Sequence, residues 1–400
     1  EYVDLMGQYY SYNSVGTAYT YFKDFDYTNS GVKSTIASFW NNLYNCIASA
    51  NNILNWADKN KGVLGETNRN QVCGEALALR AFLHFDLYRL FCPDVKLSPR
   101  AEGIPYNKEF GVALPPMYTV EEVVQLVIND LKEAETLLAS DPIVSTVPYT
   151  LGTKSDADKY VARMNLYGVK AMLARVYQAK GDNVKAVAYA KEVIESGKFR
   201  LLEFASVDQT EALTDVLFSD EHIFSLRNKE LKDYSEKLHR DEKKDGATSF
   251  KPLPFGSYYN WYEGNNDDVR YSKWFNLGDF MKYYMDNTDA FFRKMPMIKL
   301  SEMYLIVAEC SFDTDSEMSL EYLNVLRDHR IRNHVHLQYL SKESIQDEMR
   351  REYLGEGQMW YVMKRNNLKI ETGASSGDIE PSDVVYVFPM PDAEIEDGHR

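Results

Sequence analysis

The sequence predicts an all-α protein whose helices pair in the manner of tetratricopeptide repeats and stack into a superhelical scaffold. Two observations predict this class: apolar residues recur at helical spacing over long stretches, and alanines stand where two helices would approach closely. A third is the scarcity of alternating apolar and polar residues, which limits the expected strands to 221–226 and 384–388. A helix pair buries its apolar face only against another pair, so we expect the pairs to stack.

The first expected helix pair covers about residues 39–91. An apolar stripe at 72–90, broadened by phenylalanines, predicts that its second helix is buried on most sides. Thr119 and Glu122 form a capping-box pattern, which predicts the start of the next helix. That helix should end at Asp141-Pro142, because proline cannot continue it.

Two further pairs are expected, at 165–197 and at about 300–332. The first of them carries the clearest repeat signal, because its small and large apolar residues fall at the spacing of a tetratricopeptide pair. These residues are Ala174, Tyr177, Ala186, Ala190 and Val193.

Between the helix pairs lies a stretch of different character, at about 205–292. Much of it is rich in Tyr, Trp, Gly, Asn and Asp and lacks helical spacing. A long stretch of this kind inside a compact chain is usually functional or disordered, and its aromatic content argues against disorder. We predict one domain over residues 1–400, with the scaffold mainly at 39–200 and 296–365 and an irregular, aromatic insertion as the binding surface.

The charge and hydropathy of the chain argue against two kinds of partner. With 45 Lys and Arg against 60 Asp and Glu, the net charge of -15 repels phosphate backbones, so we expect no nucleic-acid partner. The longest apolar run, residues 303–308, is far shorter than the roughly 18 to 20 residues that cross a bilayer. We therefore expect no membrane-spanning helix.

The best candidate for a ligand site is an aromatic cluster within the insertion. Its members are Tyr258, Tyr259, Asn260, Trp261 and Tyr262, and amides and carboxylates follow at 263–268. A sugar needs this mixture, because its C–H faces lie on aromatic rings while its hydroxyls bond to amides and carboxylates. The alternative is a loop whose rings pack onto the helices beneath. This alternative stays open for each of the rings, although for Trp261 we favour contact with a ligand.

A second aromatic set precedes the first strong helix and mixes with serine, asparagine and glycine. Tyr19 and Tyr21 are its candidates for a ligand contact, as an opposite wall of the site. The alternative is an N-terminal segment packed along the scaffold. This alternative is favoured, because the region lacks a tryptophan and a dense cluster of amides.

The sequence carries no motif for catalysis, metal binding or a cofactor. The P-loop, the HExxH zinc motif, the GxSxG nucleophile elbow and the EF-hand loop are all missing. Asp267 and Asp268 are adjacent, whereas glycosidase carboxylates face each other across about 5 to 9.5 Å, so we assign them no catalytic role. His334 and His336 could begin a metal site, but no third ligand is apparent. We predict no enzyme, no metal and no cofactor.

Four stretches, taken in order, resemble the SusD/RagB family of outer-membrane nutrient-binding lipoproteins. They lie within 39–395, cover most of the chain and are far more specific in combination than singly. The stretches are Phe39-Trp40 with Ala50-Asn51-Asn52, residues 75–82 with 85–91, residues 296–305 with Ala308-Glu309, and Arg350-Arg351-Glu352 with Gly355-Glu356-Gly357 and Trp360. In such a scaffold they are expected to serve helix packing and ion pairs. Met359 departs from the family, which tends to carry a basic residue there, and suggests a divergent subfamily.

The resemblance implies a SusD-like helical scaffold with a loop-rich ligand face, held at the outer membrane by an N-terminal lipid. It also implies that the protein captures an oligosaccharide at the cell surface and delivers it to a SusC-type TonB-dependent transporter. The family carries a lipid-bearing cysteine near the mature N-terminus, whereas this chain opens at Glu1. We therefore expect the anchor segment to lie outside this chain.

Two other classes of function stay open at this point. Some members of the family take peptides, and a tetratricopeptide adaptor would bind a peptide in the concave groove of its helices. An all-helical glycoside hydrolase would need two carboxylates across a cleft. The sequence also leaves open which glycan is bound and whether Cys46 and Cys73 form a disulfide.

Overall fold

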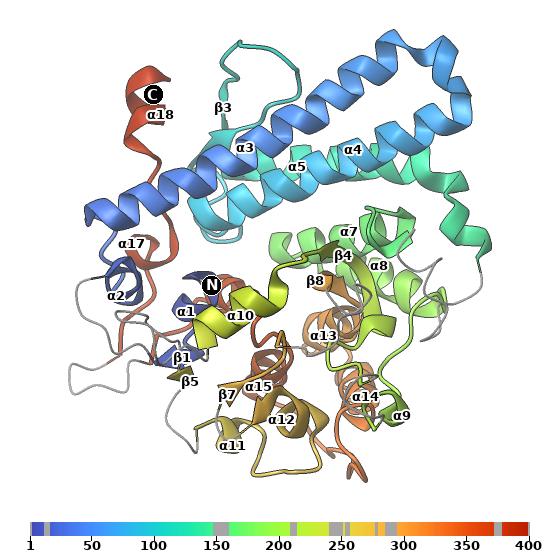
Figure 1. The fold of residues 1–400 in the computed structure, drawn as a ribbon, viewed down its shortest axis with the longest axis vertical. Helices are drawn as coiled ribbons and strands as arrows, with labels where there is room; N and C mark the ends of the chain where they lie inside the picture. Colours follow the sequence, from blue (N-terminus) through green and yellow to red (C-terminus); the bar gives the residue numbers. More distant parts are fainter. Residues whose placement is uncertain are drawn as a thin grey trace. The chain divides into compact units, whose positions relative to one another are not determined.

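The computed structural model confirms the helical class of the chain (Figure 1). It describes residues 2–11, 17–146, 160–208, 214–239, 251–252, 257–276, 279–284, 294–371 and 378–398. Within these ranges no helix is both long enough and apolar enough to cross a membrane. Cys46 and Cys73, whose pairing the sequence left open, are free thiols.

The chain divides into two compact units, which we name by their dominant character. The helical unit comprises Gly16–Ser145, Met164–Asp182 and Met363–Arg400, and the aromatic unit comprises Glu1–Val15, Thr146–Arg163 and Asn183–Val362. The expectation of a single domain over the whole chain stays a prediction.

The helical unit is built on three long helices that pack in sequence. Its elements are α2 (Ala18–Lys23), α3 (Ser30–Lys59), α4 (Lys61–Phe91), β2 (Glu102–Pro105), β3 (Met117–Thr119), α5 (Val120–Leu137), two short 3-10 turns (Leu138–Ser140 and Pro142–Ser145), α7 (Leu166–Lys180), α17 (Asp383–Tyr386) and α18 (Asp392–Asp397). Helix α3 packs on α4, α4 on α5, and α5 on α7. The pair predicted at 39–91 is thus confirmed as α3 and α4, both longer than expected.

Local chemistry explains where these helices begin and end. The Asn29 side chain caps α3 by accepting the Gly31 N–H at 2.9 Å. The predicted start of α5 is confirmed, because the Glu122 carboxylate accepts both the N–H and the hydroxyl of Thr119 at 2.8 Å. Helix α7 ends at Gly181, whose φ of 83° is the left-handed conformation that favours glycine.

The aromatic unit mixes helices with short two-stranded ribbons. Its elements are α1 (Tyr2–Met6), β1 (Tyr10–Ser11), α8 (Asn183–Glu195), α9 (Phe204–Val207), a 3-10 turn (Ser219–Glu221), β4 (His222–Arg227), α10 (Leu231–His239), β5 (Lys251–Pro252), α11 (Ser257–Trp261), α12 (Val269–Trp274), β6 (Phe275–Asn276), β7 (Asp279–Phe280), β8 (Lys294–Lys299), α13 (Leu300–Ser311), α14 (Ser316–Asp328) and α15 (Lys342–Glu352). Helix α16 (Met359–Arg365) begins in this unit and ends in the other. Each ribbon is antiparallel, pairing β1 with β5, β4 with β8, and β6 with β7.

Helix α13 is the centre of the aromatic unit. It packs on α8, α14 and α15, and the β4–β8 ribbon leads directly into it. The strand predicted at 221–226 is confirmed as β4, and the pair predicted at 300–332 as α13 with α14. The pairing predicted within 165–197 stays a prediction, because α7 packs mainly on α5 and α8 mainly on α13.

Two expectations about local structure are wrong. The strand expected at 384–388 is instead the short helix α17, after which the Phe388 N–H bonds to the Leu90 carbonyl at 2.9 Å. This stretch reads as a strand because it is rich in valine and aromatic residues, but β-propensity needs a partner strand to take effect. The insertion at 205–292 is also less irregular than expected, since it holds α9 to α12 among its described residues.

Candidate functional site

Trp261 ends helix α11 and is half-buried, so that part of the residue stays accessible to a ligand. Its neighbours include aromatic and charged side chains. The Tyr258 ring lies 4.7 Å from it, the Tyr9 ring meets it edge-on at 5.8 Å, and the Arg350 guanidinium lies 5.4 Å from its centroid. Aromatic and charged side chains therefore hold part of the Trp261 ring.

Tyr258 and Tyr262, two of the predicted ligand residues, are buried, at 5% and 2% exposure. Both hydroxyls are engaged by the protein: that of Tyr258 donates to the Tyr9 carbonyl, and that of Tyr262 to the Arg351 carbonyl at 3.1 Å. Burial also raises the pKa of the Tyr262 hydroxyl well above its ordinary value. In the structure these two buried tyrosines support the segment, and their contact with a ligand stays a prediction.

Tyr259 and Asn260 are the exposed members of the predicted cluster. Tyr259 is 39% exposed, and its ring lies 5.6 Å from that of Tyr271. Gly264 passes close to the same ring, where an added Cβ would meet it at 3.3 Å, and has a φ of 66°. The exposed candidates of this segment are therefore Tyr259, Asn260 and Trp261.

Tyr19 and Tyr21, the predicted opposite wall, lie on α2 in the helical unit. Both are half-buried. Their place in the ligand site stays a prediction.

Arg351 fixes the backbone of the Trp261 segment from beneath. Its Nε donates to the Trp261 carbonyl, and its other two nitrogens pair with Glu263 at 2.8 Å and with Glu348 at 2.6 Å. Arg327 binds the same two carboxylates, each at 2.8 Å. Two arginines thus clamp the turn that follows the tryptophan.

A buried ion network continues below this clamp. Arg270 pairs with Asp268 at 2.7 Å and also contacts Glu348, while Glu352 accepts Arg270, Arg330 and Lys299 at 2.9 to 3.1 Å. Burial alone would raise the pKa of Glu352, but Arg330 and Lys299 outweigh it and hold that pKa well below its ordinary value.

The network explains two features of the sequence. Asp268 and Arg270 have a structural role, because Asp268 caps α12 and both side chains are buried. In the Arg350-Arg351-Glu352 landmark, which was expected to form ion pairs, Arg351 and Glu352 do so, and Arg351 also places the ligand segment. The sequence did not predict that Arg351 holds the Trp261 segment. The only indication in the sequence was a run of charged residues on a helix whose buried face is also charged.

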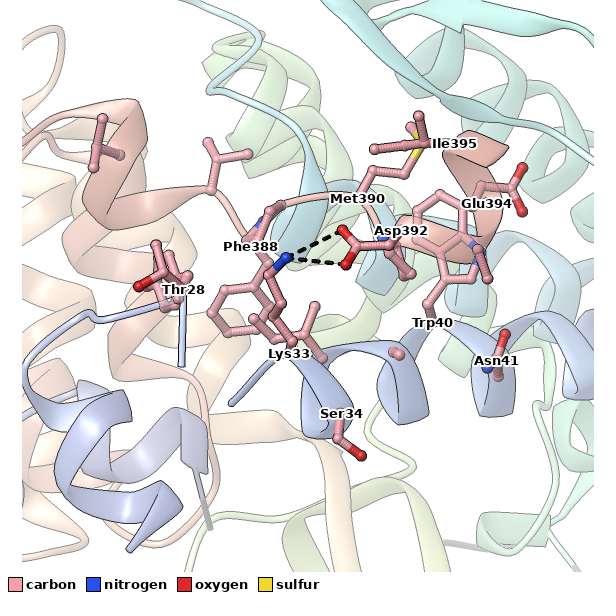
Figure 2. A pocket seen from close by; sticks show the side chains of 18 of the residues that line it. Thr28, Lys33, Ser34, Trp40, Asn41, Phe388, Met390, Asp392, Glu394 and Ile395 are labelled. Atoms are coloured by element: carbon pink, nitrogen blue, oxygen red, sulfur yellow. Dashed lines mark hydrogen bonds and ion pairs between the residues drawn. The ribbon is translucent and has the colours of Figure 1, made fainter. Parts of the chain in front are cut away.

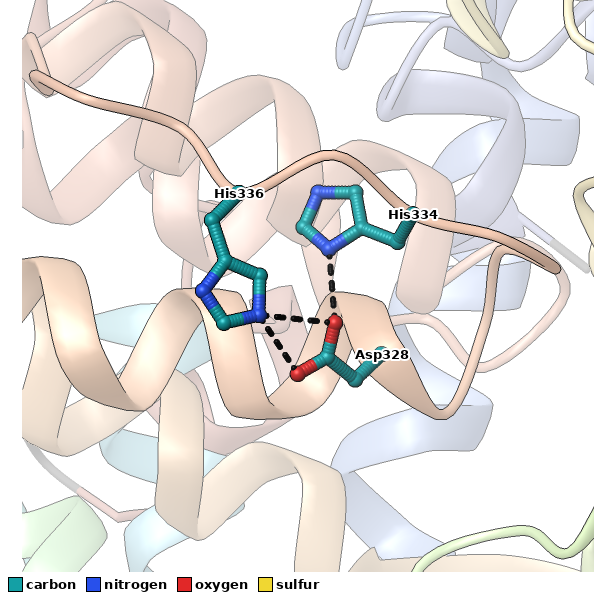
Figure 3. A group of neighbouring side chains, drawn as sticks. All are labelled: Asp328, His334 and His336. Atoms are coloured by element: carbon teal, nitrogen blue, oxygen red, sulfur yellow. Dashed lines mark hydrogen bonds and ion pairs between the residues drawn. The ribbon is translucent and has the colours of Figure 1, made fainter.

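Asp328 joins His334 and His336 in a three-residue cluster that the sequence did not predict (Figure 3). The Asp328 carboxylate lies 2.9 Å from a nitrogen of each ring. Arg327 Nε donates to His334 Nε2 at 3.1 Å, and because arginine only donates, His334 must carry its proton on Nδ1, facing Asp328. A metal on Nδ1 would force that proton onto Nε2, against Arg327. In this arrangement the cluster holds the 333–337 loop, and the expectation of no metal stays a prediction.

A separate cavity of about 930 Å³ lies within the helical unit (Figure 2). It runs between the first half of α3 and the 383–395 segment, with Trp40 and Phe388 among its lining residues. Lys33 reaches from α3 to Asp392 on α18, forming an exposed ion pair at 3.0 Å. The sequence gave no signal for this cavity, because its two walls are more than 340 positions apart in the chain.

The fold of this chain is similar to those of solved structures. A SusD-like carbohydrate binding protein from Bacteroides vulgatus has a TM-score of 0.75 at 20% identity, over 98% of this chain and 89% of that one. Surface glycan-binding protein A from Bacteroides uniformis has a TM-score of 0.73 at 18% identity, over 99% of this chain and 91% of that one. These similarities establish the fold.

Sequence comparison adds the family. A SusD-like protein of Formosa agariphila is 40% identical over 74 residues, a match that spans 18% of this chain and 14% of that relative's length. Residues 3–166 match a SusD-like family model described as starch-binding associating with outer membrane, and residues 256–384 match the model of the SusD family. The resemblance seen in the sequence is thus confirmed, and the chain belongs to the SusD/RagB family.

Proposed function

We propose that this protein is a non-enzymatic, surface-exposed binding protein that captures an oligosaccharide and passes it to a SusC-type TonB-dependent transporter. The observation that carries the proposal is the partly exposed Trp261, with Tyr259 and Asn260 beside it, on a backbone fixed by Arg351. We further propose that an N-terminal lipid, outside this chain, holds the protein at the cell outer membrane.

The chemistry of the segment suits a sugar. An exposed aromatic ring offers an apolar face to C–H groups, and the Asn260 amide offers both donors and an acceptor to hydroxyls. The support from buried tyrosines and arginines means that little ordering is needed when a ligand arrives, and preorganisation of this kind favours affinity. Tyr19 and Tyr21 remain secondary candidates for ligand contact.

The test is loss of glycan binding in Trp261→Ala. Parent and variant are compared by calorimetry against plant, host and microbial glycans. Stacking on one ring contributes about 1 to 3 kcal/mol by analogy with nucleobases, so affinity should fall by about tenfold or more. Trp56→Ala is the matched control, since it removes a tryptophan that is 51% exposed on α3.

Two outcomes would count against the Trp261 site. Unchanged affinity in Trp261→Ala with a lowered melting temperature would make the residue structural, and Tyr19→Ala and Tyr21→Ala would then be tested. Release of new reducing ends from the bound glycan would favour a hydrolase instead. The delivery step is tested separately, by asking whether a TonB-dependent transporter copurifies with the lipidated protein from native outer membranes.

A peptide ligand is the second candidate function, and the cavity of the helical unit favours it. Asp383, Asp392 and Glu394 line this cavity against a single lysine, Lys33, and apolar Ile395 is 44% exposed at its edge. A peptide with basic and apolar side chains would match this lining. Binding of such a peptide that is lost in Ile395→Asp but retained in Trp261→Ala would support this alternative.

A further inference from the structure

Arg350 differs from the other arginines around the Trp261 segment. Arg270, Arg327, Arg330 and Arg351 each form ion pairs with buried or half-buried carboxylates. Among the residues that the structure describes, the Arg350 side chain has no carboxylate partner, and its guanidinium donates from Nη1 to the Gly7 carbonyl at 3.2 Å. No ion pair within these residues therefore neutralises its positive charge.

The Arg350 guanidinium is also held in place. It lies 5.8 Å from the centroid of the Tyr9 ring and 5.4 Å from that of Trp261, and it is half-buried. Cation–π contact with the two rings and the bond to Gly7 hold the guanidinium, and among the described residues only Nη1 is seen to donate a hydrogen bond, although a guanidinium carries five N–H donors. Such a planar, preorganised fork matches a carboxylate, which it can bind through two parallel hydrogen bonds.

We propose that the Trp261 site recognises an acidic oligosaccharide, with Arg350 binding the carboxylate of a uronic acid. The inference rests on the proposed function and names the class of its ligand. The Arg350 guanidinium lies close enough to Trp261 that one sugar unit could contact both side chains. Apolar contact and charge recognition are thereby combined on adjacent side chains.

The charge around the site permits an anion despite the net charge of -15. In the clamp, Arg327 and Arg351 pair with the carboxylates Glu263 and Glu348, whereas Arg350 has no carboxylate partner among the described residues. At physiological ionic strength charges beyond roughly 8 Å are largely screened, so the charge of Arg350 acts on an adjacent anion more strongly than distant acidic side chains do.

The experiment compares each uronate polymer with its own carboxyl-reduced form. Polygalacturonate, alginate and a glucuronate-bearing xylan are used, together with dextran and dextran sulfate, and the readout is affinity electrophoresis followed by calorimetry. Parent protein should bind at least one uronate polymer about tenfold or more tightly than its reduced form. Arg350→Gln should abolish that preference, so that the variant binds the uronate polymer and its reduced form with the same affinity.

Controls separate this inference from the function on which it rests. Arg332→Gln removes the same charge from a half-buried arginine paired with Asp208, and it should keep the preference for uronate. Trp261→Ala should weaken both forms of the polymer. If Trp261→Ala weakens binding but Arg350→Gln does not, the glycan site stands and the acidic ligand is wrong.

Three other results would overturn the acidic ligand. They are equal binding of the uronate and reduced forms, tighter binding of dextran sulfate than of any uronate polymer, and no binding of the three uronate polymers by the parent. If Arg350→Gln lowers the melting temperature while the preference for uronate persists, the role of Arg350 is to hold Gly7.

Discussion

The two units hold their functional surfaces in different ways. In the helical unit, α4 and α5 meet through fully buried apolar side chains such as Phe85, Val124 and Leu131, and Arg80 pairs with Asp130 at 2.7 Å. In the aromatic unit, the segment that carries Trp261 rests on a group of fully buried charges, with Glu348 and Glu352 at its centre.

The difference teaches how a short, aromatic segment can be ordered without a long apolar helix. Apolar packing tolerates change better, because removing a side chain loses only its buried apolar area and leaves a cavity. A buried ion network is demanding, because removing one partner leaves the others charged and desolvated. The aromatic unit therefore gains a fixed ligand segment at the cost of sensitivity to any change in its charges.

The largest effect should follow the loss of Glu352. Glu352→Gln leaves Arg270, Arg330 and Lys299 with one carboxylate fewer in a buried site, which we expect to cost about 3 to 5 kcal/mol of the free energy of unfolding. Urea denaturation measures the loss, and amide hydrogen exchange should place it in α13 and α15 rather than in α4. Equal loss of protection in both units would contradict the comparison.

Acid should weaken the aromatic unit through the same network. Burial would raise the pKa of Glu348 and Glu352, but neighbouring guanidinium groups, and Lys299 at Glu352, hold both pKa values below the ordinary 4.5. A carboxylate whose pKa is lower in the folded than in the unfolded protein stabilises the fold at pH values above its unfolded pKa. This stabilisation is lost as the pH falls below the unfolded pKa. The urea midpoint should drop between pH 4.5 and about pH 3, and it should drop less in Glu352→Gln.

Leu131→Ala tests the apolar side of the comparison. The side chain is fully buried in α5, so its truncation should cost about 2 to 5 kcal/mol, depending on how far the site collapses. The loss should be almost independent of pH between 4.5 and 3, in contrast to the acid effect. A strongly pH-dependent loss would mean that α5 is also held by charge.

A smaller effect is expected at the start of α7. The buried Asn165 side chain accepts the Gly168 N–H at 3.0 Å, and Asn165→Ala should cost about 1 to 2 kcal/mol in urea denaturation. Asn165→Asp, which keeps the accepting oxygen, should recover part of this loss. A cost equal to that of Asn165→Ala would show that the cap is not the cause.

The smallest effect is expected for the exposed ion pair that Lys33 forms with Asp392. Both side chains are largely in water, so Asp392→Asn should change stability by less than about 1 kcal/mol. Thermal melting checks this directly. A cost comparable to that of Glu352→Gln would show that burial does not decide the value of a charge in this protein.

Much of the helical unit could be predicted from the sequence because its cues are local. The stripe at 72–90 and the Thr119 capping box each report on residues within a few turns, and both are found in the structure. Helix α17 was predicted as a strand because its valines favour strands, whereas the choice depends on a partner that is distant in the chain.

The candidate site could be predicted only in part. Composition pointed to the 258–262 cluster, and Trp261 does keep an exposed surface beside aromatic and charged neighbours. It could not separate Tyr258 and Tyr262, which are buried, from Tyr259, which is not. Their difference arises from contacts with Tyr9 and Arg351, which lie 249 and 89 positions away in the chain.

The hydrogen bond from Arg351 to the Trp261 carbonyl has a consequence for how this surface can diversify. A carbonyl oxygen is present whichever side chain its residue carries, so the clamp holds the backbone without reading the residue identity. Asn260 and Trp261 can therefore be exchanged for other side chains while the segment stays in place. Single substitutions at these two positions can therefore change the ligand preference without changing the fold.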